Sequence, residues 1–214
     1  MIITKKEINN GHTYGECFID QRRKNVYVNI PKNASTWAKE YFEFGYNYLQ
    51  FDNFNKNTGL KKLPKIVILR DPVSRWISGI SEYLMRHPSV VDIDNNVLQL
   101  LINKMHFDPH TDCQVNFLHG LESNFCTFFY VDNKLQENLQ DYMDQKHFEK
   151  GPNFFKVKDI KKNSMEENGN LRWKTQILDL MRLDDTIEKR IKEYYYDDYY
   201  LISKVNFYQK QIIR

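Results

Sequence analysis

Two consecutive strand–turn–helix patterns constrain the fold of this chain more than any other feature. Apolar side chains alternate over 25–30, as expected of a strand, and then recur every three or four residues, which indicates a helix over 36–49. A second strand is indicated over 65–70, again followed directly by a helical pattern. A strand–helix–strand unit normally forms a parallel pair with a right-handed crossover. The sequence therefore predicts an α/β fold in which a central parallel β-sheet is flanked by helices.

The turn of the first pattern has the composition of an anion-binding loop. Pro31 ends the strand because it lacks the N–H that a ladder needs, and Lys32 supplies a positive charge. Ser35 or Thr36 is expected to cap the helix that follows. Because the free N–H groups and the dipole of a helix N-terminus favour negative charge, the segment 31–37 predicts a phosphate or sulfate site. An ordinary strand-to-helix turn is the alternative interpretation.

The second turn places an arginine at the carboxyl end of its strand, where open α/β sheets bind their ligands. The continuous apolar run before it is typical of a strand that is covered on both faces. Asp71 is a good N-cap, and Pro72 suits the first helical position. Arg70 offers a planar guanidinium that suits a phosphate, to which Ser78 could add a hydroxyl. Alternatively, Arg70 pairs with Asp71 and Ser78 packs in the core.

Together, these two segments resemble the sulfotransferases that use 3′-phosphoadenosine-5′-phosphosulfate (PAPS) as the sulfuryl donor. The segment Pro31-Lys32-Asn33-Ala34-Ser35-Thr36-Trp37 is similar to the loop that binds the 5′-phosphosulfate in that family. The segment 70–78 is similar to its 3′-phosphate motif, in which Arg-Asp-Pro is followed by a further Arg and a Ser. Carbohydrate sulfotransferases of the Golgi type and their bacterial relatives are the most similar branch. The resemblance extends over about 25–201. It implies the P-loop-like fold of that family, and PAPS bound by all of these loop residues, by Arg70 and by Ser78.

The segment 106–118 supplies candidates for catalysis. It resembles the family's Asp-x-His stretch followed by Pro-Gln, with Cys113 at the position of the proline. Sulfuryl transfer needs a base that takes the proton of the acceptor hydroxyl, and a histidine with an ordinary pKa suits neutral pH. His110 is the first candidate for that base, and Lys32 for the cation that neutralises the leaving oxygen. Weaker candidates for the base are His106, Glu82, Glu40 and Glu43.

Other interpretations stay open from the sequence. His110 can be an ordinary loop histidine, or a metal site can use the side chains that alternate along this segment, namely His106, Asp108, His110 and Asp112. A P-loop kinase is disfavoured because no glycine lies between Asn25 and Phe44. A relative that binds sugars without transferring sulfate is compatible with two departures from the family pattern. These are Cys113 and Ile80, where the family usually has an aromatic residue.

The length of 214 residues suits a single domain, 1–214, and the net charge of +3 suits a protein that binds a polyanionic donor but no nucleic acid. No apolar run reaches the ~18 residues of a membrane span, and the N-terminus lacks the apolar core of a signal peptide. The Golgi relatives carry a membrane anchor, whereas this sequence shows no such segment, so we expect a cytoplasmic enzyme from a bacterium or a virus.

The three cysteines have no metal spacing and are expected to be reduced thiols. By resemblance, the acceptor is a hydroxyl-bearing carbohydrate.

The rest of the chain is predicted to alternate between helices and short strands. Helices are expected over 90–105, over 132–145 and from 175 onward, and strands over 125–131 and 154–160. The polar loop 161–170 resembles a family loop near the nucleoside of the donor, which makes Lys162 and Ser164 weak candidates for binding there. A solvated loop is the alternative. Trp173 either stacks on adenine or packs in the core. The tyrosine-rich stretch 194–201 includes an Asp-Tyr pair similar to one near the C-terminus of the family.

Overall fold

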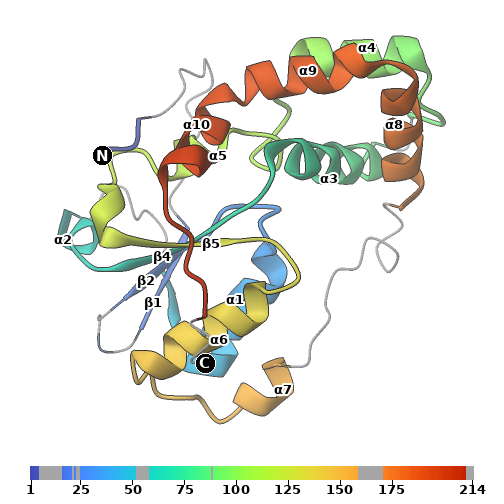
Figure 1. Cartoon of the computed structure of the whole chain (residues 1–214). Coiled ribbons are helices and arrows are strands. Elements are labelled where there is room, and N and C mark those ends of the chain that lie inside the picture. Colours follow the sequence, from blue (N-terminus) through green and yellow to red (C-terminus); the bar gives the residue numbers. More distant parts are fainter. Residues whose placement is uncertain are drawn as a thin grey trace.

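The chain forms a layered α/β structure in which helices cover both faces of a five-stranded sheet (Figure 1). The computed structural model describes residues 1–4, 16–20, 22, 25–51, 58–87, 89–158 and 171–210. The strands are β1 (Cys17–Ile19), β2 (Val26–Val28), β3 (Leu49–Phe51), β4 (Lys65–Leu69) and β5 (Cys126–Tyr130). The helices are α1 (Ser35–Tyr46), α2 (Thr58–Lys61), α3 (Pro72–Met85), α4 (Asn95–Lys104), α5 (Gln114–Phe117), α6 (Leu135–Gln145), α7 (Phe154–Lys158), α8 (Leu171–Leu183), α9 (Asp185–Tyr194) and α10 (Tyr196–Lys204), with a 3-10 turn η2 (Ser123–Phe125).

The sheet is mixed, with the strand order β3-β1-β2-β4-β5. β2, β4 and β5 run parallel, as predicted, with Val28 beside Val67 and Leu69 beside Tyr130. β1 is antiparallel to β2, and β3 is antiparallel to β1. The prediction of a parallel sheet is therefore correct for the strands that carry the two turns and wrong for the sheet as a whole. The two strands that it omitted are only three residues long.

The first helix is shorter than predicted, and its end explains the extra strand. α1 ends at Tyr46 rather than at residue 49. Asn47 follows with a left-handed φ of 56°, and its N–H donates to the carbonyl oxygen of Phe42. Asparagine tolerates this conformation better than most residues, so it is a common helix terminator. The chain then turns back along β1 as β3, whose three residues are exposed at the sheet edge.

Each face of the sheet carries its own hydrophobic core. Along β4, Ile66 and Ile68 pack with α1 and α6, whereas Val67 and Leu69 pack with α3, α8 and α9. Alternate side chains of a strand point to opposite faces, so a strand between two cores must be apolar throughout. Residues Ile66 to Leu69 are buried, as the continuous apolar run predicted, and Lys65 at the start of the strand is buried as well.

Several later elements differ from the predicted ones. α4 begins only at Asn95, because Asp94 caps it by accepting the N–H of Val97 at 2.8 Å. Residues 154–158 form the helix α7 instead of a strand, since a short apolar run fits either structure and α7 packs against α1. The predicted strand before α6 is confirmed as β5, and the C-terminal helices as α8, α9 and α10.

Trp173 is buried in the core of the α3 face, and Lys162 and Ser164 lie outside the described residues. Among the residues that the structure describes, no helix combines the length and the apolar character needed to cross a membrane.

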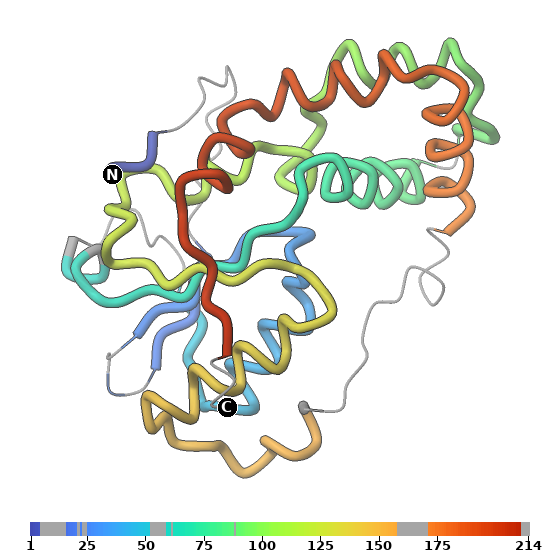
Figure 2. Tube along the Cα trace, in the orientation of Figure 1, coloured from blue at the N-terminus to red at the C-terminus, as the bar shows by residue number. Residues whose placement is uncertain are grey.

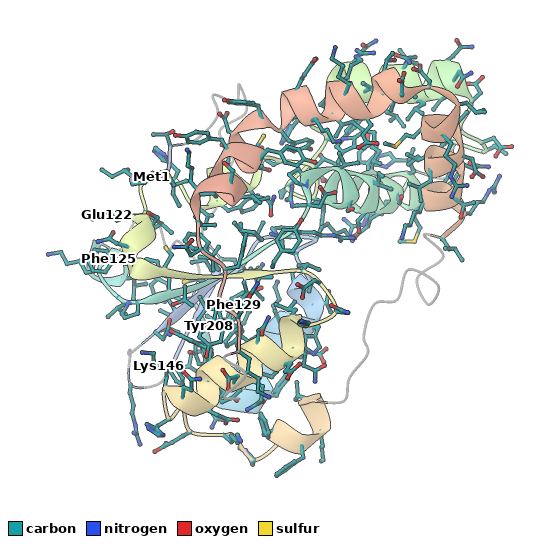
Figure 3. The ribbon with its side chains drawn as sticks, viewed as in Figure 1. Met1, Glu122, Phe125, Phe129, Lys146 and Tyr208 are labelled. Carbon is teal, nitrogen blue, oxygen red and sulfur yellow. The ribbon has the colours of Figure 1, made fainter. Side chains whose placement is uncertain are left out.

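The segment after α10 returns to the sheet and covers the outer edge of β5 (Figure 2). Phe207 forms a parallel bridge with Phe128, and the N–H of Tyr208 donates to the carbonyl oxygen of Phe128 at 2.8 Å. The ring of Tyr208 lies 5.5 Å from that of Phe129 (Figure 3). This pairing shields backbone groups that an open sheet edge would expose.

Candidate functional site

The loop between β2 and α1 owes its shape to two residues in the left-handed conformation. Lys32 has a φ of 69° and Ala34 a φ of 56°. Ala34 takes the N-cap position of α1, and no side chain caps the helix there. The prediction that Ser35 or Thr36 caps α1 is therefore wrong, since both lie inside its first turn. An uncapped helix N-terminus beside such a turn presents N–H donors in a concave array that suits an anion.

Arg70 connects the second turn to this loop. Its Nη1 donates a hydrogen bond to the carbonyl oxygen of Lys32 at 2.9 Å. The pairing of Val28 with Val67 aligns the carboxyl ends of β2 and β4 and so places the two turns side by side. Burial, followed by the charge of Arg75, lowers the pKa of Arg70, but an arginine remains protonated in a protein. The two segments that the sequence singled out thus meet at the carboxyl ends of the parallel strands.

A buried amide network holds the two turns in register. Asn33 donates its Nδ2 hydrogens to the carbonyl oxygen of Ile68 at 2.7 Å and to Oε1 of Gln114 at 2.6 Å. Gln114 also accepts the N–H of Arg70 at 3.0 Å and donates Nε2 to the carbonyl oxygen of Arg70 at 2.9 Å. Asn33 and Gln114 are fully buried, so losing either partner would leave polar atoms unpaired away from water.

Asp198 of α10 supports this network from the C-terminal part of the chain. Its carboxylate accepts the N–H groups of Gln114 at 2.9 Å and of Val115 at 3.0 Å and so caps α5. Burial raises the pKa of Asp198 to about 6, although these hydrogen bonds oppose the shift. The adjacent Tyr199 donates its hydroxyl to Asp71 at 2.9 Å. Sequence reasoning assigned no role to Gln114 or Asp198; the only signals were the glutamine and the Asp-Tyr pair of the resemblance.

Arg75 connects the loop between β2 and α1 (residues 31–37, here called the anion loop) to the segment that carries His110. It is fully buried, and its Nε donates to the carbonyl oxygen of Pro31 at 3.0 Å. Its Nη2 donates to the carbonyl oxygen of Pro109 at 3.1 Å, and its Nη1 to that of Asp112. The sequence presented Arg75 only as part of a motif spacing. The structure shows a side chain that fixes two functional segments relative to each other.

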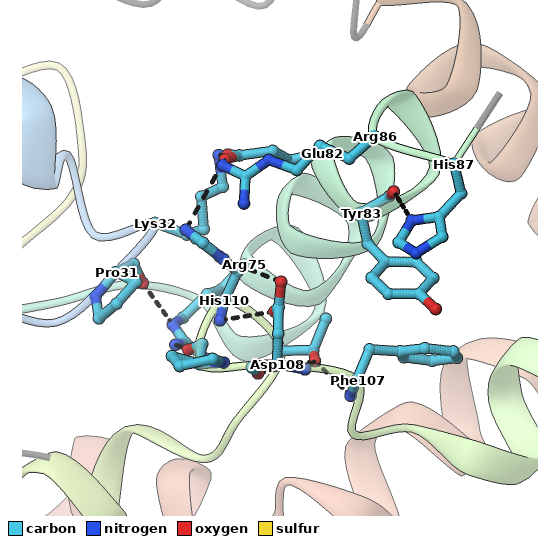
Figure 4. A network of polar contacts seen from close by, with 12 residues as sticks. Pro31, Lys32, Arg75, Glu82, Tyr83, Arg86, His87, Phe107, Asp108 and His110 are labelled. Carbon is cyan, nitrogen blue, oxygen red and sulfur yellow. Dashed lines mark hydrogen bonds and ion pairs between the residues drawn. The ribbon is translucent and has the colours of Figure 1, made fainter. Parts of the chain in front are cut away.

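His110 is oriented by the aspartate two residues before it (Figure 4). Its Nδ1 lies 3.1 Å from Oδ2 of Asp108, and its backbone N–H donates to Oδ1 of the same carboxylate at 2.8 Å. This contact favours the tautomer with the proton on Nδ1, which leaves Nε2 able to accept a proton. Nε2 faces Glu82, with 3.7 Å to Oε1. Gly79 permits this arrangement, because a Cβ there would lie 2.4 Å from the carbonyl oxygen of His110.

Glu82 receives basic side chains from three directions (Figure 4). Lys32 from the anion loop and Arg86, the C-cap residue of α3, form ion pairs with its carboxylate, and His110 lies beside it. Burial raises the pKa of Glu82, but the hydrogen bond and charge of Lys32, with the charges of His110 and Arg86, outweigh it and lower the pKa overall. The predicted cation, the predicted base and a second carboxylate therefore form one cluster.

The remaining predicted residues lie on α1, on α3 and in the turn after α4. Ser78 is buried on α3, one helical turn before Glu82 and on the same face. Trp37 is half-buried, and its ring stacks on Tyr41 with 4.9 Å between centroids. The other candidates for the base lie on α1 and in the turn after α4; these are Glu40, Glu43 and His106.

Among the side chains proposed for a metal site, one oxygen of Asp112 bonds to groups outside the proposed set. Oδ1 of Asp112 accepts the N–H of Cys113 and the side-chain amide of Asn116, both at 2.8 Å. The carboxylate of Asp108 contacts His110. Within the described ranges, no group of three or more histidine, cysteine, aspartate or glutamate side chains could hold a metal ion.

A cavity of about 550 Å³ lies at the other edge of the sheet. Asn25, Pro64 and Thr127 line it, at the amino ends of β2, β4 and β5. The anion loop follows the carboxyl end of β2, so this cavity is not part of the candidate site.

Comparisons of the chain with models of protein families, with curated proteins and with solved structures gave no match. The case for a function therefore rests on the geometry of this site and on the resemblance of its motifs.

Proposed function

We propose that this protein transfers a sulfuryl group from PAPS to an acceptor hydroxyl, on a carbohydrate. The observation that carries the proposal is the hydrogen bond between the guanidinium of Arg70 and the carbonyl oxygen of Lys32. It joins two turns, each with the composition of an anion site, at the carboxyl edge of a sheet, where α/β proteins bind ligands. A nucleotide with phosphate groups at its 3′ and 5′ positions offers one anion to each turn.

The residues present fit such a donor. Lys32 and the uncapped N-terminus of α1 provide a cation and N–H donors for the 5′-phosphosulfate. Arg70 and Ser78 are the residues that the resemblance assigns to the 3′-phosphate, and both follow β4. PAPS supplies an activated sulfuryl group on a phosphate leaving group. The carbohydrate nature of the acceptor rests on the resemblance to carbohydrate sulfotransferases.

The cluster around His110 suits the proton transfer of this reaction. The acceptor oxygen must lose its proton as it bonds to sulfur, and Nε2 of His110 accepts that proton in our proposal. Asp108 then stabilises the imidazolium through its contact with Nδ1 at 3.1 Å. Lys32 neutralises the negative charge on the phosphate oxygen that leaves sulfur; a charge placed in this way is usually the largest catalytic contribution.

Two measurements test the proposal. Isothermal titration calorimetry should show that 3′-phosphoadenosine-5′-phosphate (PAP), the desulfated product of the donor, binds the purified protein at one site. Sulfur-labelled PAPS, offered with a panel of carbohydrates, tyrosine-containing peptides and small alcohols, should yield a labelled carbohydrate. Absence of PAP binding would falsify the proposal. Glycan binding without any labelled product would indicate a silent relative, and magnesium-dependent ATP turnover a kinase.

A further inference from the structure

Glu82 occupies a position that the proposed function does not by itself explain. Its carboxylate pairs with Lys32, the cation that the reaction needs at the leaving oxygen. The same carboxylate pairs with Arg86 and lies 3.7 Å from Nε2 of His110. The side chains of Lys32, Glu82 and His110 are 18%, 15% and 25% exposed, so water screens their mutual interaction only in part.

A carboxylate and a phosphosulfate interact with a lysine in the same way. Both are anions whose oxygen atoms accept charge-assisted hydrogen bonds from an ammonium group. Lys32 cannot give its full charge to Glu82 and to a bound donor at once. Glu82 keeps Arg86 as a partner when Lys32 leaves, because Arg86 is the C-cap residue of α3, four positions after Glu82. The carboxylate therefore stays paired in either arrangement.

We propose that Glu82 is a positioning residue that exchanges partners during the catalytic cycle. It holds Lys32 in the free enzyme and turns to Arg86 and His110 once the donor has taken Lys32. When His110 has accepted the acceptor proton at Nε2, the imidazolium lies between Asp108 at Nδ1 and Glu82 near Nε2. This inference rests on the proposed function and adds a residue that the reaction alone does not require.

The substitution Glu82→Gln separates this role from a structural one. Glutamine keeps the size of the side chain but removes its charge. Without a competing carboxylate, Lys32 is free for the donor, so PAP should bind about two- to tenfold more tightly. Turnover should fall by about tenfold, because the imidazolium loses one of its two carboxylates. A residue with a merely structural role would weaken binding and turnover together.

The matched control is Glu137→Gln. It changes the net charge by the same amount, but Glu137 lies on α6, outside the cluster. Its carboxylate forms an exposed ion pair with Lys210 at 3.1 Å. Thermal melting of both variants shows whether they fold. Calorimetry with PAP gives the affinities, and labelled PAPS with the best acceptor of the panel gives turnover. PAP affinity that rises in Glu82→Gln and stays unchanged in Glu137→Gln supports the exchange. Affinity that is equal or lower in Glu82→Gln overturns it.

A second readout does not depend on PAP. Lys32 should react faster with an amine-acylating reagent in Glu82→Gln than in the wild type, as followed by peptide mass spectrometry, because its ion pair is gone. An unchanged rate refutes the Lys32–Glu82 exchange even where PAP binds. If the wild type binds no PAP, the proposed function fails and this inference fails with it.

Discussion

Lys32 lies in the anion loop and pairs with Glu82 of helix α3, the carboxylate that also faces the candidate base His110. We expect Lys32→Ala to lower the rate of sulfuryl transfer by about 10²–10³-fold, because a placed charge at the leaving oxygen is lost. PAP binding should weaken by less, since Arg70 and the N–H groups of the loop remain. Transfer of labelled sulfate and calorimetry measure the two effects. Lys39→Ala, which removes a lysine paired with Glu16 at 2.7 Å, is the control and should keep full activity.

Arg70 should show the opposite balance between binding and turnover. In the proposed function its guanidinium binds the 3′-phosphate, which takes no part in bond breaking. We therefore expect Arg70→Ala to weaken PAP binding by about tenfold or more. Turnover at saturating PAPS should change little. Calorimetry and a donor titration at fixed acceptor separate the two. Unchanged affinity with a large loss of turnover would contradict the assignment of Arg70 to the donor's remote end.

The packing of helix α3 against the His110 segment depends on one glycine. A Cβ at Gly79 would lie 2.4 Å from the carbonyl oxygen of His110, a backbone atom that cannot move without the loop. We therefore expect Gly79→Ala to lower the free energy of unfolding by about 1–3 kcal/mol and to reduce transfer activity. At Gly45 in α1, the nearest atom, in Phe154, is 3.8 Å from an added Cβ. Gly45→Ala should therefore be neutral or stabilising by up to ~1 kcal/mol. Chemical denaturation of both variants provides the comparison.

The contact between α10 and α5 should make stability depend on pH in a specific window. Burial raises the pKa of Asp198 from 3.8 to about 6. The folded protein holds this proton more tightly than the unfolded chain, so its stabilising effect is complete below about pH 4 and is lost as pH rises through 6. The lost contribution is about 3 kcal/mol.

Asp198→Asn removes this titration. The unfolding free energy of the wild type, relative to that of the variant, should therefore fall by about that amount between pH 4 and 7. Asp94→Asn, at the surface cap of α4, controls for the loss of a capping carboxylate. A difference between wild type and Asp198→Asn that stays constant with pH would refute the assignment.

Local patterns predicted the elements that carry the site but not the contacts that fix them. The strands β2, β4 and β5, the positions of the two turns and the cap at Asp71 follow from periodicity and turn chemistry over short stretches, and the structure confirms them. The bonds that join Gln114 to Asp198 and Arg75 to Pro31 link residues 84 and 44 positions apart, which no local period reveals. The prediction that Ser35 or Thr36 caps α1 failed for a different reason. The N-cap is Ala34 in a left-handed conformation, and an alanine side chain does not favour that conformation, so no residue type indicates it in advance.

The C-terminal part of the chain contacts the rest of the molecule in two places. Asp198 and Tyr199 on α10 contact α5 and Asp71 beside the candidate site. The segment after α10 then covers β5, where Tyr208 donates its hydroxyl to Asp141 at 2.6 Å. A sequence pattern of helices over this region gives no register for either contact. The candidate site is therefore assembled from residues as far apart as Lys32 and Asp198.

The segment after α10 should keep the edge of β5 from pairing with another chain. The ring of Tyr208 packs 5.5 Å from Phe129 and 5.3 Å from Tyr142, and its backbone pairs with Phe128. We expect Tyr208→Ala to lower the free energy of unfolding by about 2 kcal/mol and to release the segment, which exposes a sheet edge able to pair with another chain. Light scattering should then show association that increases with protein concentration.

Two further measurements separate this effect from damage to the site or from the loss of a tyrosine in general. Tyr200→Ala, at a half-exposed tyrosine of α10, should leave the protein as dispersed as the wild type. PAP affinity of Tyr208→Ala should equal that of the wild type, because Tyr208 packs on β5 and bonds to α6 rather than to the residues of the candidate site. A dispersed Tyr208→Ala protein would mean that β5 is protected by its own twist and side chains rather than by the C-terminal segment.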